Sequence, residues 1–279
     1  MGWRVRVWIR RSEERKSALI PYQGSQLSPF GLTNSIANTS NQSLLLLPPS
    51  PSPQKVLVGD SILAGRDALW GLGAINKYLN DFSGQKLDNF AKIGSSLHDG
   101  WVTSVPQLYT DMRTKTAPAV PTTIVLNGGG NDVISVRDDC WAFNDKCRLQ
   151  IDSAMEIAEK LILRMHNDGV QHIIYLGFYY AFNMTQAADY GTESLKRVCG
   201  AAAVDCHVAD VRNLNIVVGW DGMHPGENLY AVHPRLTRPC LSQKPPTSFF
   251  TSYLFLGDAG YKQLAWRIWE TKLEHNVPF

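Results

Sequence analysis

The sequence predicts an α/β fold in which helices cover both faces of a parallel β-sheet. From Gln54 onward, short apolar runs alternate with segments of helical periodicity, which is the pattern of successive β-α units. The chain has 279 residues, of which 44% are hydrophobic and 19% charged, and this suits one large domain better than two. The crossovers are expected to be right-handed, and because the strands are parallel their carboxyl ends lie at one edge of the sheet.

Each element is predicted from its periodicity. Five short runs rich in β-branched or aromatic residues are expected to be strands; they are 55–59, 86–94, 122–127, 170–180 and 204–211. Five longer segments with apolar residues on one face are expected to be helices; they are 66–80, 100–115, about 150–167, 192–200 and 261–273. The sequence contains no internal repeat.

The folded domain is expected to span 54–279. Residues 1–53 begin with a basic segment and continue into a tract rich in Ser, Asn and Gln. We expect this segment to be disordered, with the Pro-Ser run at 48–53 as a linker, or to result from a misassigned start. A misassigned start codon would also disguise a signal peptide.

Chemically active residues follow the ends of several predicted elements. They are Gly59, Asp60 and Ser61 after the first strand, Gly94 after the second, Gly130, Asn131 and Asp132 after the third, and Asp221 with His224 near the end. Because the carboxyl ends of parallel strands share one edge of the sheet, these groups are expected to converge into a single site.

These blocks, in this order, resemble the SGNH (GDSL-type) hydrolases. The resemblance covers about residues 54–225 and resumes at 257–270. It implies a flavodoxin-like, three-layer α/β/α fold. It also implies a triad of Ser61 as nucleophile, His224 as base and Asp221 as the group that orients His224. The implied oxyanion hole consists of the Ser61 and Gly94 backbone N–H groups and the Asn131 side-chain amide.

The chemistry of these residue types supports the same roles. A serine hydroxyl is a weak nucleophile until an imidazole accepts its proton, and the imidazole needs a carboxylate that fixes its tautomer. The oxyanion of the tetrahedral intermediate needs preorganised donors, which Asn131 and the backbone at Gly94 can supply. The glycines of NGGGND, 127–132, fit clearance for Asn131 better than phosphate binding, because neither phosphate-loop fingerprint is complete.

Each residue also has a purely structural interpretation. Ser61 can cap a helix N-terminus, whereas Asp60 and Asp132 are expected to support their loops through hydrogen bonds. The aromatic run 178–182 is expected to form a strand end and pocket wall. The remaining histidines have no carboxylate at a useful sequence spacing and are expected on the surface or in packing; they are His98, His166, His172, His207, His233 and His275.

The five cysteines predict two local disulfides. Cys140 and Cys147 are seven residues apart, as are Cys199 and Cys206, which favours an oxidising compartment and secretion over buried free thiols. The spacing lacks a C-x-x-C pair, so no metal site is expected, and no cofactor is expected either.

The net charge of +2 gives no reason to expect nucleic-acid binding, and no apolar run is long enough for a membrane span. We expect a monomer that acts on a small-molecule or carbohydrate ester.

The sequence departs from the family pattern after Pro225. Residues 226–256 separate DGMHP from GDAGYKQLAW, and removing them joins the two parts into the expected family ending. We interpret this segment as a retained intron or as a lid beside His224.

Taken together, the site residues and the family resemblance predict a serine esterase that acts through an acyl-enzyme on acetylated carbohydrate or short-chain acyl esters. Acyl transfer and a non-catalytic binding module on the same fold are the alternatives; a nucleotide-dependent oxidoreductase lacks its glycine fingerprint.

Overall fold

A computed structural model describes most of the predicted domain. The described residues are 54–66, 74–99, 102–181, 184–214, 216, 218, 223–225 and 259–279. All of them belong to the unit Pro49–Phe279. The predicted disordered segment 1–53, the segment 226–256 and Asp221 lie outside the described residues, so the hypotheses about them remain sequence-based.

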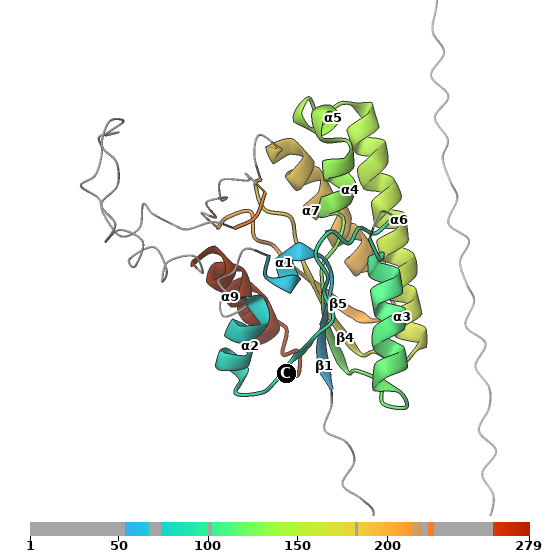
Figure 1. The fold of residues 1–279 in the computed structure, drawn as a ribbon, viewed down its shortest axis with the longest axis vertical. Helices are drawn as coiled ribbons and strands as arrows, with labels where there is room; N and C mark the ends of the chain where they lie inside the picture. Colours follow the sequence, from blue (N-terminus) through green and yellow to red (C-terminus); the bar gives the residue numbers. More distant parts are fainter. Residues whose placement is uncertain are drawn as a thin grey trace, which may run out of the picture. The chain divides into compact units, whose positions relative to one another are not determined.

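The core of the molecule is a five-stranded parallel sheet (Figure 1). Its strands are β1 (Lys55–Val58), β2 (Asp88–Asn89), β3 (Thr123–Leu126), β4 (His172–Leu176) and β5 (Asp205–Ala209). Their order is β2-β1-β3-β4-β5, and every neighbouring pair is parallel. This is the flavodoxin-like order, in which the chain reverses its direction of winding between β1 and β3, where ligands usually bind.

Helices cover both faces of this sheet, as the alternating pattern predicts (Figure 1). On one face, α3 (Val105–Thr116), α6 (Asp145–Asn167) and α7 (Thr185–Ala201) bury their apolar residues against the strands. On the other face, α2 (Ile75–Ser83) and α9 (Ala259–Glu274) form a second apolar layer. The central strands are buried on both sides, which explains their continuous apolar runs. The predicted three-layer α/β/α class is confirmed.

Several element boundaries differ from the prediction for local reasons. Strand β2 pairs over only two residues, and α6 begins about five residues earlier because the Asn144 side chain accepts hydrogen bonds from the N–H groups of Lys146 and Cys147. Helix α2 starts at Ile75 rather than near 66, with 67–73 outside the described residues. The short helices α1 (Ser61–Ala64), α4 (Gly130–Ser135) and α5 (Arg137–Trp141) were not expected from periodicity, because they are too short to show it.

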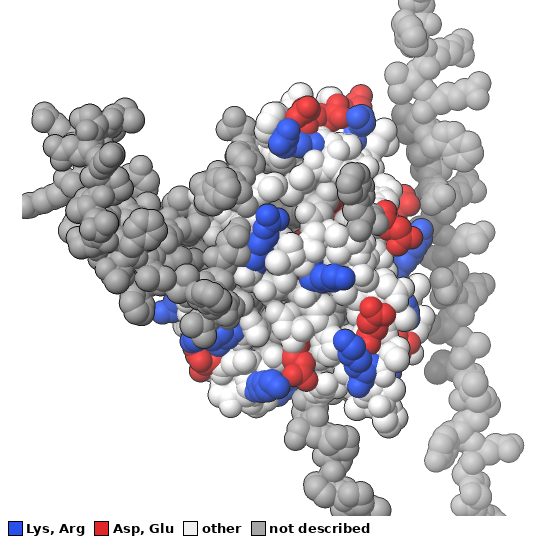
Figure 2. All heavy atoms as spheres, in the orientation of Figure 1, with Lys and Arg blue, Asp and Glu red and all other residues white. Residues whose placement is uncertain are grey.

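Both predicted disulfides are present in the structure. Cys140 bonds Cys147 and ties α5 to the first turn of α6, and Cys199 bonds Cys206 and ties the end of α7 to β5. Across the described residues, no helix is both long and apolar enough to cross a bilayer. On the described part of the face in Figure 2, acidic and basic side chains are interspersed rather than gathered into one patch.

Candidate active site

Ser61 and His224 meet at the carboxyl edge of the sheet. Their Oγ and Nε2 atoms are 2.8 Å apart, and the two residues are only 6% and 5% exposed. Ser61 is the first residue of α1, directly after β1, whereas His224 lies 163 positions later in the chain. The hydrogen bond fits an imidazole that accepts the serine proton, which is the contact that activates a serine nucleophile.

The loop that carries Ser61 is fixed by a reciprocal pair between Asp60 and Asn127. The Asp60 N–H donates to Asn127 Oδ1 over 2.9 Å, and Asn127 Nδ2 donates to Asp60 Oδ1 over 2.6 Å. The same Asp60 oxygen accepts from the Ile62 N–H and caps α1. Burial raises the pKa of Asp60, and the hydrogen bonds from Ile62 and Asn127 partly offset this. Asp60 therefore joins the ends of β1 and β3 under the serine.

Gly59 makes this pairing possible. A Cβ at this position would lie 1.8 Å from Asn127 Oδ1, far inside van der Waals contact. Only glycine allows the Asn127 side chain to approach the backbone before Asp60. The glycine of the GDS motif is thus explained by the close approach of two strand ends.

Asn131 lines the same pocket from α4, and its amide is held in place. Its Nδ2 donates to the Ser95 carbonyl oxygen over 2.7 Å. Gly94, the residue before Ser95, has a φ of +83°, a backbone conformation that favours glycine. The hydrogen bond joins the loop after β2 to the helix after β3, so the predicted oxyanion donors come from adjacent segments. Gly94 itself does not line the pocket.

Asp132 supports the loop that contains Gly94 and Ser95. Its carboxylate accepts from the backbone N–H groups of Leu97 and His98, at 2.8 and 3.0 Å. It also lies 2.6 Å from His98 Nδ1, while His98 Nε2 lies 2.9 Å from Ser153 Oγ on α6. Asp132 makes the structural contacts expected of a loop support rather than facing Ser61.

Three of the histidines outside the predicted triad are partly exposed, which fits the expected surface or packing positions, and each also pairs with a carboxylate. His98 pairs with Asp132, whereas His172 and His207 both pair with Asp205, at 2.7 Å each. Asp132 lies 34 positions from His98 and Asp205 lies 33 positions from His172, so spacing along the chain could not reveal these two pairs. Asp205 is only two positions before His207 on β5, a spacing that the sequence interpretation overlooked. For Gly129, the structure gives a reason other than the predicted clearance for Asn131: its φ is +99°, and a Cβ there would lie 3.0 Å from the Phe178 ring.

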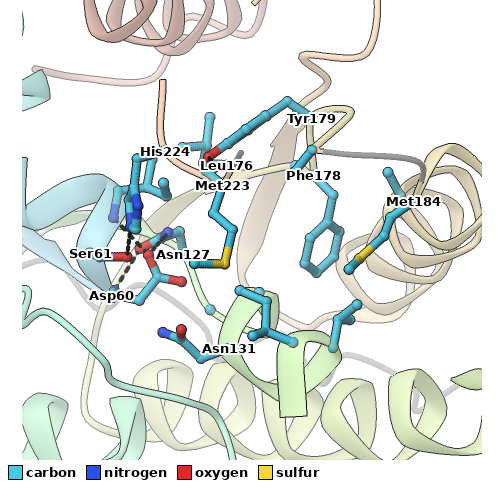
Figure 3. Close-up of a pocket in the computed structure, with 18 of the residues that line it drawn as sticks. Asp60, Ser61, Asn127, Asn131, Leu176, Phe178, Tyr179, Met184, Met223 and His224 are labelled. Carbon is cyan, nitrogen blue, oxygen red and sulfur yellow. Dashed lines mark hydrogen bonds between the residues drawn. The ribbon is translucent and has the colours of Figure 1, made fainter. Parts of the chain in front are cut away.

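The pocket beside Ser61 has a cavity volume of about 100 Å³ and opens to solvent. Figure 3 shows Ser61, Asp60 and His224 on one side of it and Phe178 and Met184 on the other. The predicted aromatic wall is present, since Phe178 and Tyr179 line the pocket. The Tyr179 hydroxyl donates to the Met223 carbonyl oxygen and so holds the backbone next to His224. Sequence reasoning missed this role, because nothing in the run 178–182 points to residue 223.

The predicted residues thus divide into three groups. Ser61, His224, Asn131 and Asp60 lie together around one pocket, while Gly94 and Asp132 lie behind the Asn131 segment. Asp221 lies outside the described residues. Two residues with clear structural roles, Asn127 and Tyr179, were not identified from the sequence.

The structure thus combines a parallel α/β sheet with a buried Ser61–His224 contact beside a pocket at its carboxyl edge, and comparison with known proteins gives the family. The chain belongs to the GDSL-like lipase/acylhydrolase family, whose model matches residues 56–265, more than half of the chain. It is therefore an ester-hydrolysing enzyme. Comparison with curated proteins finds no match.

Solved structures show the same fold at low sequence identity. The crystal structure of TesA is 14% identical, with a TM-score of 0.51 over 80% of this chain and 99% of that one. A carbohydrate esterase family 2 enzyme with a carbohydrate-binding domain, from Corynascus thermopiles (Myceliophthora fergusii), is 16% identical, with a TM-score of 0.50 over 81% of this chain and 68% of that one. At these identities the likeness concerns the fold alone.

Proposed function

We propose that the protein is a serine esterase that hydrolyses carboxylic esters through an acyl-enzyme, with Ser61 as nucleophile and His224 as general base. The observation that carries this proposal is the buried 2.8 Å contact between Ser61 Oγ and His224 Nε2 at the edge of the sheet where β1 and β3 end. Asp221, three positions before His224, is proposed from the sequence as the carboxylate that orients the imidazole.

In the first half-reaction, His224 accepts the Ser61 hydroxyl proton as Oγ attacks the ester carbonyl. The carbon–oxygen π electrons move to the carbonyl oxygen and form an oxyanion. When this intermediate collapses, the bond to the alcohol breaks and His224 returns the proton to the leaving oxygen. In the second half-reaction, His224 accepts a proton from water as the water oxygen attacks the carbonyl carbon of the acyl-enzyme. When this second intermediate collapses, its bond to Ser61 Oγ breaks, His224 returns the proton to Oγ, and the carboxylic acid leaves.

The oxyanion is proposed to accept hydrogen bonds from the Asn131 amide and from the backbone N–H groups of Ser61 and Gly94. The Ser95 carbonyl takes one N–H of the Asn131 amide, which fixes the amide plane and leaves the second N–H for the oxyanion. Such preorganised donors are effective because they need no reorganisation as charge develops.

The proposed substrates are short-chain acyl esters or acetylated carbohydrate. The two disulfides are stable in an oxidising environment and support a secreted protein, as expected for an enzyme that acts on extracellular esters. Transfer of the acyl group to another alcohol uses the same acyl-enzyme, and product analysis with an added alcohol separates it from hydrolysis.

Hydrolysis of p-nitrophenyl acetate tests the proposal. The assay compares the full chain, the chain lacking 226–256, and each of these with Ser61→Ala. We expect turnover that disappears with Ser61→Ala; silence of the full chain alone would identify 226–256 as an artefact or an inhibitory lid. If the full chain and the chain lacking 226–256 both fold with Ser61 intact, and neither hydrolyses p-nitrophenyl acetate or an acetylated-sugar ester, the esterase proposal is wrong. Binding of the sugar without turnover would then favour the non-catalytic module.

A further inference from the structure

Beyond Ser61, the pocket continues as an apolar space between α4 and α7, here called the acyl chamber. Its walls come from the two helices and from the segment between β4 and α7; the residues are Val133, Ile134, Phe178, Met184, Ala187 and Ala188. Met184, Ala187 and Ala188 are 6%, 3% and 6% exposed, so the chamber is closed on the α7 side. Small residues on that helix leave the space that a larger side chain would fill.

The Phe178 ring, which forms part of the chamber wall, is packed closely between two glycines. The Phe178 ring lies between Gly129 and Gly191, where an added Cβ would be 3.0 Å and 2.9 Å from ring atoms. Glycine at both positions therefore makes room for the ring. Gly191 belongs to α7 and Gly129 precedes α4, so the two helices that form the walls also fix the ring.

Polarity divides the pocket into two ends. Its polar side chains belong to the reacting end or border it; they are Asp60, Ser61, Asn127, Asn131, Tyr179 and His224. The Tyr179 hydroxyl already donates to the Met223 carbonyl. The hydroxyls of a sugar ring in the chamber would lose their water partners without replacement, which is costly. An alkyl chain has no such requirement and gains from burial.

The chemistry assigns this alkyl chain to the acyl side of the ester. The leaving alcohol must receive a proton from His224 and then depart, whereas the acyl chain stays attached to Ser61 until water attacks. Figure 3 shows His224 and the Phe178–Met184 wall at opposite ends of the pocket. A closed apolar chamber away from His224 therefore suits the acyl chain, which stays attached to Ser61.

We propose, on the basis of the esterase function proposed above, that the acyl chamber binds an unbranched acyl chain longer than acetyl. The natural substrates then belong to the class of short- to medium-chain fatty acyl esters. The alcohol part lies toward the open mouth, beside His224, and is selected less strictly than the acyl part.

Two isomeric esters separate the acyl side from the alcohol side. Ethyl hexanoate and hexyl acetate have the same composition and similar leaving groups, and titration of the released acid measures both. We expect kcat/KM of the full chain, or of the chain lacking 226–256 if only that is active, to favour ethyl hexanoate by about tenfold or more. From ethyl acetate to ethyl butanoate we expect a rise of about tenfold for two buried methylenes.

Substitutions in the chamber locate the effect. Ala188→Phe fills the chamber, and the hexanoate-to-acetate ratio of kcat/KM is expected to fall at least tenfold. Ile134→Thr keeps a branched side chain but adds a hydroxyl, and the ratio is expected to fall about threefold to fivefold. Gln186→Phe introduces the same ring at an exposed position of α7 and is expected to leave the ratio unchanged. Ile134→Thr remains informative if Ala188→Phe does not fold.

The outcomes distinguish the two proposals. Cleavage of acetate esters that depends on Ser61, with no preference for longer acyl chains, would overturn the acyl chamber and leave the esterase intact. Preference for hexyl acetate, reduced by Ala188→Phe, would place the alcohol in the chamber and also overturn this inference. Absence of hydrolysis of every ester would instead contradict the esterase function itself.

Discussion

The Nδ1 atom of His98 lies 2.6 Å from Oδ1 of Asp132, and this contact joins the loop after β2 to helix α4. Asp132 is only 3% exposed, and its carboxylate accepts hydrogen bonds from two backbone N–H groups of the same loop. Ser95, three positions before His98, accepts the Asn131 amide. The position of the proposed oxyanion donor therefore depends on a carboxylate that does not line the pocket.

Asp132→Ala is expected to lower kcat about tenfold to a hundredfold with a smaller change in KM, because small displacements of catalytic groups have effects of this size. The change also leaves two backbone N–H groups without their acceptor, so the free energy of unfolding should fall by about 1–3 kcal/mol. Steady-state kinetics and urea unfolding measure the two effects. Ser153→Ala is the control, since it removes only the outer partner of His98 and should change kcat less than threefold. A folded Asp132→Ala protein with normal kcat would contradict the positioning role.

Asn131→Ala is expected to reduce kcat about 10²- to 10³-fold, the usual effect of removing one oxyanion donor. KM should change little, because the oxyanion exists only in the transition state and intermediate. Stopped-flow and steady-state assays with p-nitrophenyl esters measure this directly. A rise in KM with kcat unchanged would show that Asn131 binds the ground state instead.

The three-layer arrangement could be predicted from the sequence because the central strands are continuous apolar runs and the longer helices show their periodicity. Ser61, His224 and Asn131 could be placed at one edge because a parallel sheet gathers its strand ends there. The short helix α4 shows no such period, and its start at Gly130 follows from the conformation of Gly129. Strand β2 was overestimated, since only Asp88 and Asn89 pair with β1.

Residues that act through long-range contacts could not be found from the sequence. Asn127 is paired with Asp60 across 67 positions, and Tyr179 reaches Met223 across 44. An Asn after a strand and a Tyr in an aromatic run are both common, so neither gives a local signal. His98 was interpreted as a surface or packing residue for the same reason, since its partner Asp132 lies 34 positions away.

Gly59→Ala is expected to destabilise the fold by about 2–4 kcal/mol, because the new Cβ would overlap Asn127 Oδ1 and break the pair with Asp60. Esterase activity should fall as well, since this pair fixes the residue before Ser61. Gly200→Ala makes the same chemical change in α7, where an added Cβ meets no atom within 4 Å. That control should be neutral or more stable by up to about 1 kcal/mol. Equal unfolding midpoints for the two variants would show that the strand ends can separate without cost.

The two disulfides predict a labelling pattern. The chain has five cysteines, and four of them form the bonds 140–147 and 199–206. Alkylation of the denatured protein should add at most one group before reduction and five after it. Reduction should lower the free energy of unfolding by about 2–3 kcal/mol per bond, the value for loops this short in the chain-entropy model. Mass spectrometry that finds five labels before reduction would contradict both bonds in the purified protein.

Asp210 should make stability depend on pH in the acid range. Arg212 donates to both of its carboxylate oxygens, at 2.9 and 2.5 Å, and Lys196 lies 2.8 Å away. The hydrogen bonds from Arg212 hold the pKa of Asp210 well below its usual value, although burial opposes this and Lys196 assists. A lowered folded-state pKa adds stability that is complete above the unfolded value of about 4 and is lost as the pH falls through the folded value.

Asp210→Asn is therefore expected to reduce the free energy of unfolding by about 1–2 kcal/mol at pH 7, a range for a charge-assisted hydrogen bond in a partly buried pair. The loss remains moderate because Arg212 keeps its contacts with Asp189 and Glu193. The difference in free energy of unfolding between the variant and the unmodified protein should narrow as the pH is lowered below about 4. In this range the stability that the ionised Asp210 carboxylate contributes is progressively lost. Urea titrations at pH 7, 5, 4 and 3 measure it. Asp138→Asn is the matched control, because that side chain is 82% exposed and its change should stay within about 0.5 kcal/mol. A difference for Asp210→Asn that stays constant down to pH 3 would show that packing, rather than charge, accounts for its contribution.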